Sequence, residues 1–118
     1  RKYVFATSLG AYDLHFDLTV TYTSETADIM EFYEDFESAI NSRVTGGFKS
    51  GPCVKRLKDV RAMHAAGLSS DNPQKMEVHY ELLYKGARLC VEARVPSSMN
   101  LDEEIRNIED VIDSIEYY

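Results

Sequence analysis

Histidine and acidic side chains at alternate positions are the residues of this sequence best placed for metal chemistry. His15 and Asp17 lie two residues apart in one predicted strand, and Glu77, His79 and Glu81 alternate in another. Alternate residues of a strand share a face, so two such strands side by side would gather imidazoles and carboxylates, which are ligands for divalent metals. Isolated polar residues on a solvated sheet face give the same pattern. We therefore assign no metal ligands.

Nucleophilic catalysis would need a residue such as Cys90 beside a base such as His79. The nucleophile also needs an activating environment and a site for an oxyanion. The chain contains no glycine-rich phosphate loop, no HExxH helix and no GxSxG turn. We assign no catalytic or cofactor-binding residues and expect a non-enzymatic protein. Two carboxylates on different strands could also act as a general acid and a general base, and such a pair has no characteristic spacing in the sequence. An enzymatic function therefore stays open.

The two cysteines, Cys53 and Cys90, fit either one disulfide or two free thiols. Their spacing resembles neither a CxxC redox pair nor a zinc site. A disulfide would indicate an oxidising compartment. The sequence does not decide between the disulfide and the free thiols, so it does not identify the compartment either.

Length and charge indicate one folded domain over residues 1–118. Hydrophobic residues make up 44% of the chain, and no apolar run approaches the roughly 20 residues of a membrane span. The formal net charge of −7 disfavours nucleic-acid binding by the surface as a whole. Basic residues are concentrated between Lys49 and Arg61, where there are five against the single acid Asp59. We expect this segment to be solvated or to pack beside acidic helices.

The elements that must position these residues centre on a predicted hairpin over residues 76–95, with Lys85–Gly86 as its turn. One register makes every facing pair on one side of it apolar: Tyr84 with Ala87, Leu82 with Leu89, Tyr80 with Val91 and Val78 with Ala93. The alternate positions pair Glu77 with Arg94, His79 with Glu92 and Glu81 with Cys90. The pattern predicts an apolar face that must be covered and a polar face in solvent.

Other strands are predicted on both sides of this hairpin. Alternation predicts an N-terminal hairpin from residues 3–8 and 13–22. Residues 52–66 fit either a helix that stops at Gly67 or a strand that begins at Cys53, and we favour a strand over residues 53–60. Residues 67–73 have the composition of a loop.

Two helices are predicted from apolar residues at helical spacing. The first covers residues 24–44, with Thr23 and Ser24 as caps and residues 45–47 as its end. The second covers residues 100–118, with Asn100 as its cap and Glu103 three positions later. Each helix has one apolar stripe, so each is expected to pack on the sheet.

Three stretches occur in an order that resembles a known family. They are the strand Phe16-Asp17-Leu18-Thr19-Val20-Thr21-Tyr22, the helix 28–44 with a stripe of Phe32, Phe36 and Ile40, and Lys49-Ser50-Gly51-Pro52-Cys53-Val54-Lys55-Arg56-Leu57. The order resembles the SEA domain of mucin-like and other cell-surface proteins, whose Tyr-x-Gly-Cys-x-Val-x-x-Leu passage the third stretch matches in part. The resemblance covers roughly residues 16–84. It implies a ferredoxin-like sandwich, a strand at Cys53 and a non-enzymatic extracellular adhesion or spacer role. The family's Gly-Ser-Val-Val-Val self-cleavage turn has no counterpart here, so autoproteolysis is not implied.

Together these patterns predict an α+β fold in which an antiparallel sheet of four or five strands carries two amphipathic helices on one face. The expected function is a protein-interaction or structural module, one domain of a larger cell-surface protein. Its partner is expected either on the acidic helix face of Glu31, Glu34 and Asp35 or on the exposed face of the sheet.

Two alternative functions stay open. One is a small acidic inhibitor that mimics a polyanion and binds a basic site on another protein. The other is a ligand carrier or enzyme with a pocket between sheet and helices, lined by Tyr12, Tyr33 or Tyr80.

Overall fold

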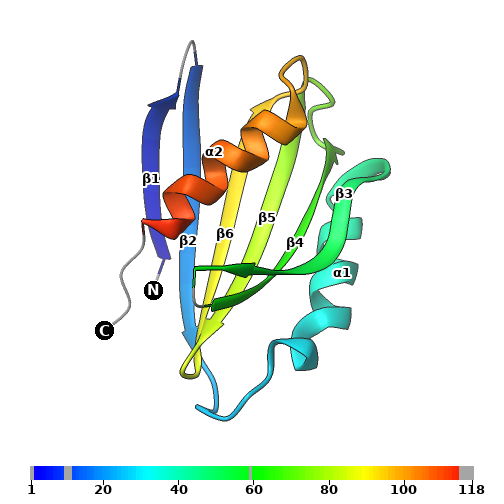
Figure 1. Ribbon diagram of the computed structural model, residues 1–118. Helices are drawn as coiled ribbons and strands as arrows, with labels where there is room; N and C mark the ends of the chain where they lie inside the picture. The colour runs from blue at the N-terminus through cyan, green and yellow to red at the C-terminus, as the bar shows by residue number, and fades with distance from the viewer. Residues whose placement is uncertain (1, 10–11, 59, 115–118) are drawn as a thin grey trace.

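The computed structural model describes residues 2–9, 12–58 and 60–114 and shows one antiparallel sheet with two helices (Figure 1). The six strands are β1 (Lys2–Leu9), β2 (Tyr12–Tyr22), β3 (Val44–Leu57), β4 (Val60–Ser69), β5 (Lys75–Tyr84) and β6 (Ala87–Pro96). Their order across the sheet is β1-β2-β6-β5-β4-β3. The helices are α1 (Tyr33–Asn41), preceded by the 3-10 turn η1 (Ile29–Phe32), and α2 (Leu101–Asp113). The predicted α+β class is confirmed, and the sheet has more strands than the four or five expected.

The central hairpin has the register that the sequence predicts. Glu77 pairs with Arg94, His79 with Glu92 and Glu81 with Cys90. Lys85 and Gly86 both have positive φ, at 47° and 80°, as a two-residue type I′ turn requires. The register therefore fixes which side chains of β5 and β6 share a face.

The N-terminal hairpin of β1 and β2 is also confirmed, and β2 pairs with β6. This pairing joins the first hairpin to the last strand of the sheet. The expected turn at residues 9–12 lies partly outside the described residues.

Residues 52–57 and 60–66 are strand, so the helical alternative is wrong, and the favoured single strand over residues 53–60 instead ends at Leu57, with the next strand beginning at Val60. These two stretches form the end of β3 and most of β4, with Arg56 opposite Arg61 and Leu57 opposite Val60. The register shifts twice along β3, between Thr45 and Ser50 and again before Cys53, so no simple alternation is visible in the sequence. The sheet gains an extra strand because β3 and β4 together form a long hairpin over residues 44–69. The loop that was expected over residues 67–73 therefore begins only after Ser69.

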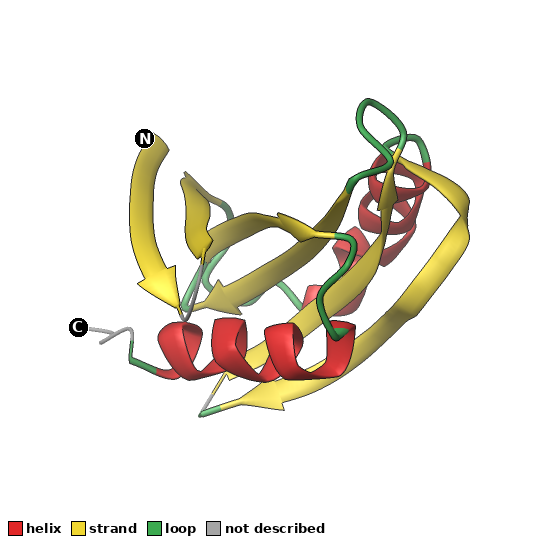
Figure 2. Ribbon diagram, turned by 90° about the horizontal axis from the view of Figure 1, so that it is seen from above, coloured by secondary structure: helices red, strands yellow, loops and turns green. Residues whose placement is uncertain are grey.

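The sheet is curved, and the far end of the β3–β4 hairpin bends toward α2 (Figure 2). Lys55 of β3 lies 2.7 Å from Glu109 of α2. Leu57 and Val60 are buried in the same cluster as the isoleucines of α2. The curvature encloses one side of α2.

The helix α2 begins as predicted and covers the apolar face of the central hairpin. The Asn100 side chain accepts a hydrogen bond from the backbone N–H of Glu103. Ile105, Ile108 and Ile112 are buried in a cluster with Val78, Tyr80, Leu82, Leu89, Val91, Ala93 and Val95. The predicted last turn at residues 115–118 lies outside the described residues.

The first helix is much shorter than the predicted 24–44. Asp28 is the N-cap and forms a capping box with Glu31, so helical structure starts at Ile29, not at the expected caps Thr23 and Ser24. Val44, predicted as the last apolar position of the helix, is the first residue of β3. The prediction fails at the N-terminal end because the cap is Asp28 and not Thr23 or Ser24, and at the C-terminal end because Val44 keeps the helical spacing although it belongs to β3.

The helix α1 lies on the face of the sheet opposite α2, whereas the sequence analysis placed both helices on one face. Phe36 and Ile40 are buried against Met63 and Ala65. Met63 and Ala65 alternate along β4 with Ala62, His64 and Ala66, whose side chains point toward the α2 side. β4 is therefore covered on both faces. Neither helix in the described ranges has the length and apolarity needed to cross a membrane.

Candidate functional site

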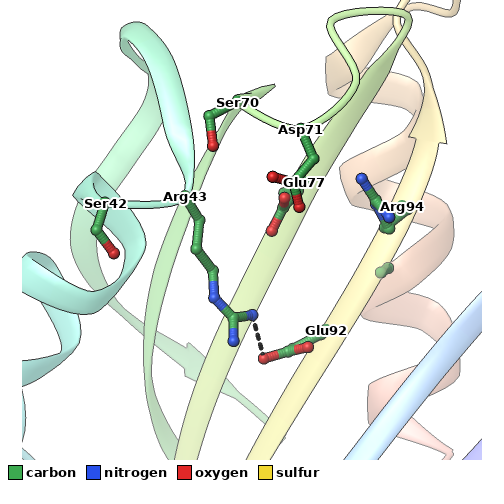
Figure 3. Close-up of a pocket in the computed structure, with 8 residues that line it drawn as sticks. Ser42, Arg43, Ser70, Asp71, Glu77, Glu92 and Arg94 are labelled. Atoms are coloured by element: carbon green, nitrogen blue, oxygen red, sulfur yellow. Dashed lines mark hydrogen bonds and ion pairs between the residues drawn. The ribbon is translucent and has the colours of Figure 1, made fainter.

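A groove runs between α1 and the face of β5 and β6 that the sequence predicted to be solvated. It consists of two hollows of about 380 and 260 Å³ that share Arg43 and Glu92 as lining residues. The larger hollow (Figure 3) is lined by Ser42, Arg43, Ser70, Asp71, Glu77, Glu92, Ala93 and Arg94. The smaller one is lined by Asp35, Phe36, Ala39, Ile40, Arg43, His79, Tyr80, Glu81, Arg88, Cys90, Val91 and Glu92. We call the two together the α1 groove.

The floor of the α1 groove holds a hydrogen-bonded network around Glu77. Ser69 Oγ donates to one carboxylate oxygen of Glu77 at 2.8 Å, and His79 Nε2 lies 2.8 Å from the other. Arg94 donates to Ser69 Oγ at 3.0 Å. Glu77 and His79 are 7% and 3% exposed, so the expectation of a solvated face is wrong for them. Their burial follows from the position of α1 over this face.

The order of groups in this network does not match a nucleophile–base pair. A catalytic serine needs the imidazole beside its hydroxyl, whereas here Glu77 lies between Ser69 and His79. The hydrogen bond from His79, together with that from Ser69, lowers the pKa of Glu77 although burial opposes the shift. A carboxylate held ionised in this way is a weak base, so the network is suited to holding β4 and β5 in place.

A second buried carboxylate, Glu81, lies in the smaller hollow. Arg88 Nε donates to Glu81 Oε1 at 2.8 Å, and Arg88 Nη2 contacts the same oxygen. The Arg88 guanidinium also lies over the Phe32 ring, 4.0 Å from its centroid. The Cys90 thiol points to Glu81 Oε1 at 3.6 Å, and burial together with that carboxylate raises the pKa of Cys90 to about 12. Cys90 is therefore a protonated thiol at neutral pH.

Two carboxylates on the rim of the α1 groove carry charge that the described residues do not neutralise. Arg43 Nη1 pairs with Glu92 at 2.7 Å where the two hollows meet. Among the residues that the structure describes, Asp35 and Asp71 take part in no side-chain hydrogen bond or ion pair, and both are exposed. Asp71 and Glu77 both line the larger hollow (Figure 3). The rim is thus acidic.

The acidic helix face predicted for a partner is present and lies beside this groove. Glu31, Glu34 and Asp35 are all exposed on η1 and the first turn of α1. Asp35 also lines the smaller hollow. Glu31 has a structural task as well, because its side chain accepts a hydrogen bond from the backbone N–H of Asp28.

The fold does not bring together the residues considered as metal ligands, nor the cysteine and histidine considered as a nucleophile and its base. The strands that carry His15 and His79 are not neighbours, because β6 lies between β2 and β5. Within the described ranges, no three histidine, cysteine, aspartate or glutamate side chains are placed to hold a metal ion. Cys90 and His79 contact different carboxylates, Glu81 and Glu77.

The disulfide considered for Cys53 and Cys90 is not formed, and both thiols are free. Cys53 pairs across the strands with His64, whose neighbours on β4 and β5 face α2. Cys90 pairs with Glu81 on the α1 side. The two thiols lie on opposite faces, with β4 and β5 between their strands.

Tyr80, which was expected to line a pocket between sheet and helices, is one of the residues that line the smaller hollow, but its side chain points to the other face of the sheet and packs in the cluster under α2. Tyr80 is 1% exposed and stacks on His64 with ring centroids 4.6 Å apart. Its hydroxyl donates to Glu109 of α2 at 2.7 Å. Tyr33 lies elsewhere and donates its hydroxyl to the Pro52 carbonyl, and the side chain of Tyr12 is outside the described set.

Sequence reasoning missed the α1 groove, although one signal pointed to it. In residues 62–66, the side chains that would point to either face of a strand are apolar, with the exception of His64. Such a run is typical of a strand covered on both faces, which would have placed a helix over the polar side of the central hairpin. A scan against protein-family models and a search of curated proteins each found no match to this chain.

Proposed function

We propose that this domain is a non-enzymatic protein-interaction module that binds a basic segment of a partner protein in the α1 groove. The observation that carries the proposal is the pair of exposed carboxylates, Asp35 and Asp71, on the groove rim, which no described cation neutralises. Glu31 and Glu34 extend the negative surface along η1 and α1. A lysine- or arginine-containing segment would supply the missing charges.

The lining of the smaller hollow supports a basic side chain over a simple cation. Phe36, Ala39 and Ile40 of α1 contribute apolar surface, and Asp35 stands at its edge. Lysine and arginine side chains combine an apolar stem with a charged end, so they match this arrangement of an apolar wall and an acidic rim.

The buried charges on the floor support binding over catalysis. Glu77 and Glu81 are each held by partners within the domain, and the Cys90 thiol is protonated. A preorganised floor of this kind costs little further ordering when a ligand binds.

The test is a titration of the isotope-labelled domain with a hexalysine peptide and, separately, a hexaglutamate peptide, followed by nuclear magnetic resonance. We expect hexalysine to shift the amide signals of α1 and of the β4–β5 loop near Asp71, and to lose affinity as salt is raised. The double variant Asp35→Asn/Asp71→Asn should bind about fivefold more weakly, as two exposed ion pairs of about 0.5 kcal/mol each would give.

The matched control is Asp110→Asn/Asp113→Asn, which removes the same charge from exposed positions of α2. This control should bind hexalysine like the unmodified domain. Shifts that spread over α2, or an equal loss of affinity in the control, would show only a non-specific attraction of the acidic chain for a cation and would refute the proposal.

A further inference from the structure

A third hollow lies at the other end of the sheet and has the opposite charge. Its volume is about 300 Å³, and it is lined by Ala27, Asp28, Ile29, Arg56, Val60, Arg61, Leu83 and Lys85. Three of these residues are cations and one is an acid. The cations come from the end of β3, the start of β4 and the turn between β5 and β6. In a chain of net charge −7, this concentration of positive charge is local.

The two arginines are placed directly against each other. Arg56 and Arg61 are facing partners of the β3–β4 pair, one position before the tip pair Leu57 and Val60. Facing residues of an antiparallel pair project to the same side of the sheet, and like charges at such positions destabilise the pair. Both side chains are exposed. The geometry holds two guanidinium groups over one hollow.

The one acid in the hollow does not balance these charges. Asp28 Oδ1 lies 3.7 Å from Arg61 Nη1, and the same oxygen accepts the backbone N–H of Met30 at 2.9 Å as the N-cap of η1. Among the described residues, Arg56 makes no side-chain hydrogen bond or ion pair. Lys85 is exposed and has its Nζ 5.3 Å from the centroid of the Tyr84 ring. Among the described lining residues, a net positive charge is left in the hollow.

We infer that this hollow, which we call the arginine hollow, binds the phosphoryl group of a phosphate monoester. Arginine presents paired N–H donors that match phosphate oxygens, and two guanidinium groups with one ammonium suit a dianion with three free oxygens. Apolar atoms of Ile29 and Leu83 in the same lining can receive the carbon part of the ester. The site is distinct from the α1 groove, because the two share no lining residue.

The test compares inorganic phosphate, O-phosphoserine and chloride at equal ionic strength, using both the thermal midpoint and amide shifts of the full domain. We expect phosphate and O-phosphoserine to raise the midpoint and to shift the amides of Arg56, Arg61 and Lys85, while chloride does neither. Tighter binding of O-phosphoserine would identify the ester as the ligand, and equal binding would identify the phosphoryl group alone, whether free or esterified.

The double variant Arg56→Gln/Arg61→Gln supplies the decisive comparison. It should lose at least about tenfold in phosphate affinity, the loss of one charge-assisted contact or more. Without phosphate, its midpoint should equal or exceed that of the unmodified domain, because the facing like charges are gone. The control Lys49→Gln/Arg106→Gln removes the same charge from exposed positions outside the hollow and should bind phosphate normally.

Two results would overturn the inference. One is an equal response to phosphate and chloride, which would show general screening. The other is phosphate binding that survives in Arg56→Gln/Arg61→Gln or is lost equally in the control.

Discussion

The Tyr80 hydroxyl and the Lys55 ammonium bind the same carboxylate oxygen, Glu109 Oε2, each at 2.7 Å. Tyr80 is on β5, Lys55 on the curved end of β3 and Glu109 on α2. One carboxylate thus joins a central strand, an outer strand and the helix that covers them. This junction holds the bent end of the sheet against α2.

Replacing Tyr80 by phenylalanine should lower the free energy of unfolding by about 1 to 2 kcal/mol. The change removes a hydrogen bond to a carboxylate and leaves the ring in place to stack on His64. Urea denaturation measures the effect. The control is Tyr22→Phe, which removes a hydroxyl from a side chain that is 85% exposed and should change stability by less than about 0.5 kcal/mol. Equal effects at the two positions would contradict the role given to Glu109.

Ser69→Ala should lower the free energy of unfolding by about 1 to 2 kcal/mol, because Ser69 Oγ both donates a hydrogen bond to Glu77 and accepts one from Arg94. Without this donor the pKa of Glu77 should rise toward its ordinary value, which a carboxyl-detected titration would show. Ser70→Ala is the neighbouring control, since Ser70 is exposed and its backbone N–H still bonds to Arg43. The network is not structural if both variants are equally stable.

Stability should fall as the pH drops from 6.5 toward 4 because of His64. Burial, and the nearby Lys55 charge, lower the pKa of His64 from 6.5 to about 4, so the unfolded chain takes up a proton in this window and the folded one does not. The loss should be about 3 kcal/mol across the window. Denaturation at stepwise pH should show a shallower slope for His64→Gln than for the unmodified domain, whatever its stability at pH 7. Parallel slopes would exclude His64 as the cause.

Glu104→Met should stabilise the domain at neutral pH by about 1 kcal/mol. Glu104 is 3% exposed, its Oε2 has no hydrogen-bond partner within the described structure, and burial raises its pKa. A raised folded pKa gives full stability below the unfolded pKa and a loss as the pH rises through the folded one. The gain from the substitution should therefore shrink in acid. Glu103→Met, at an exposed position one residue earlier, should give no such pH-dependent gain.

Cys90 should react with iodoacetamide at pH 8 about a hundredfold more slowly in the folded domain than in urea, because its raised pKa leaves little thiolate. The measurement uses the Cys53→Ser variant, so that only one thiol is followed by mass spectrometry. Fast alkylation of the folded variant would mean that Glu81 and burial do not protect the thiol. The reciprocal Cys90→Ser variant reports Cys53 separately.

The central hairpin was predictable because its facing residues sort by polarity and its turn residues permit positive φ. The ends of α1 were not. Val44 continues the helical spacing of Phe36 and Ile40, and only its pairing with Ser69 makes it a strand residue. The path of β3 was obscured by two register shifts, which remove the period of two that identifies a strand.

The candidate site was predicted only in part. The acidic residues Glu34 and Asp35 were recognised from helical spacing, since exposure on a helix is a local property. The groove beside them depends on which sheet face α1 covers. Glu77 and His79 have the composition of a solvated face, and their burial is decided by a helix more than thirty positions away in the chain.

The separation of α1 and α2 onto opposite faces divides the interior into two compartments that can open independently. η1 and α1 bury Ile29, Phe36 and Ile40 in one cluster, whereas α2 belongs to the other. A transient detachment of α1 would leave the α2 compartment closed, so the amide protons of α1 should exchange with solvent through a partial opening and those of β5 only through global unfolding. A ligand bound between α1 and the sheet would then slow the exchange of the α1 amide protons alone. Its affinity would be linked to the free energy that is needed to detach α1 from the sheet.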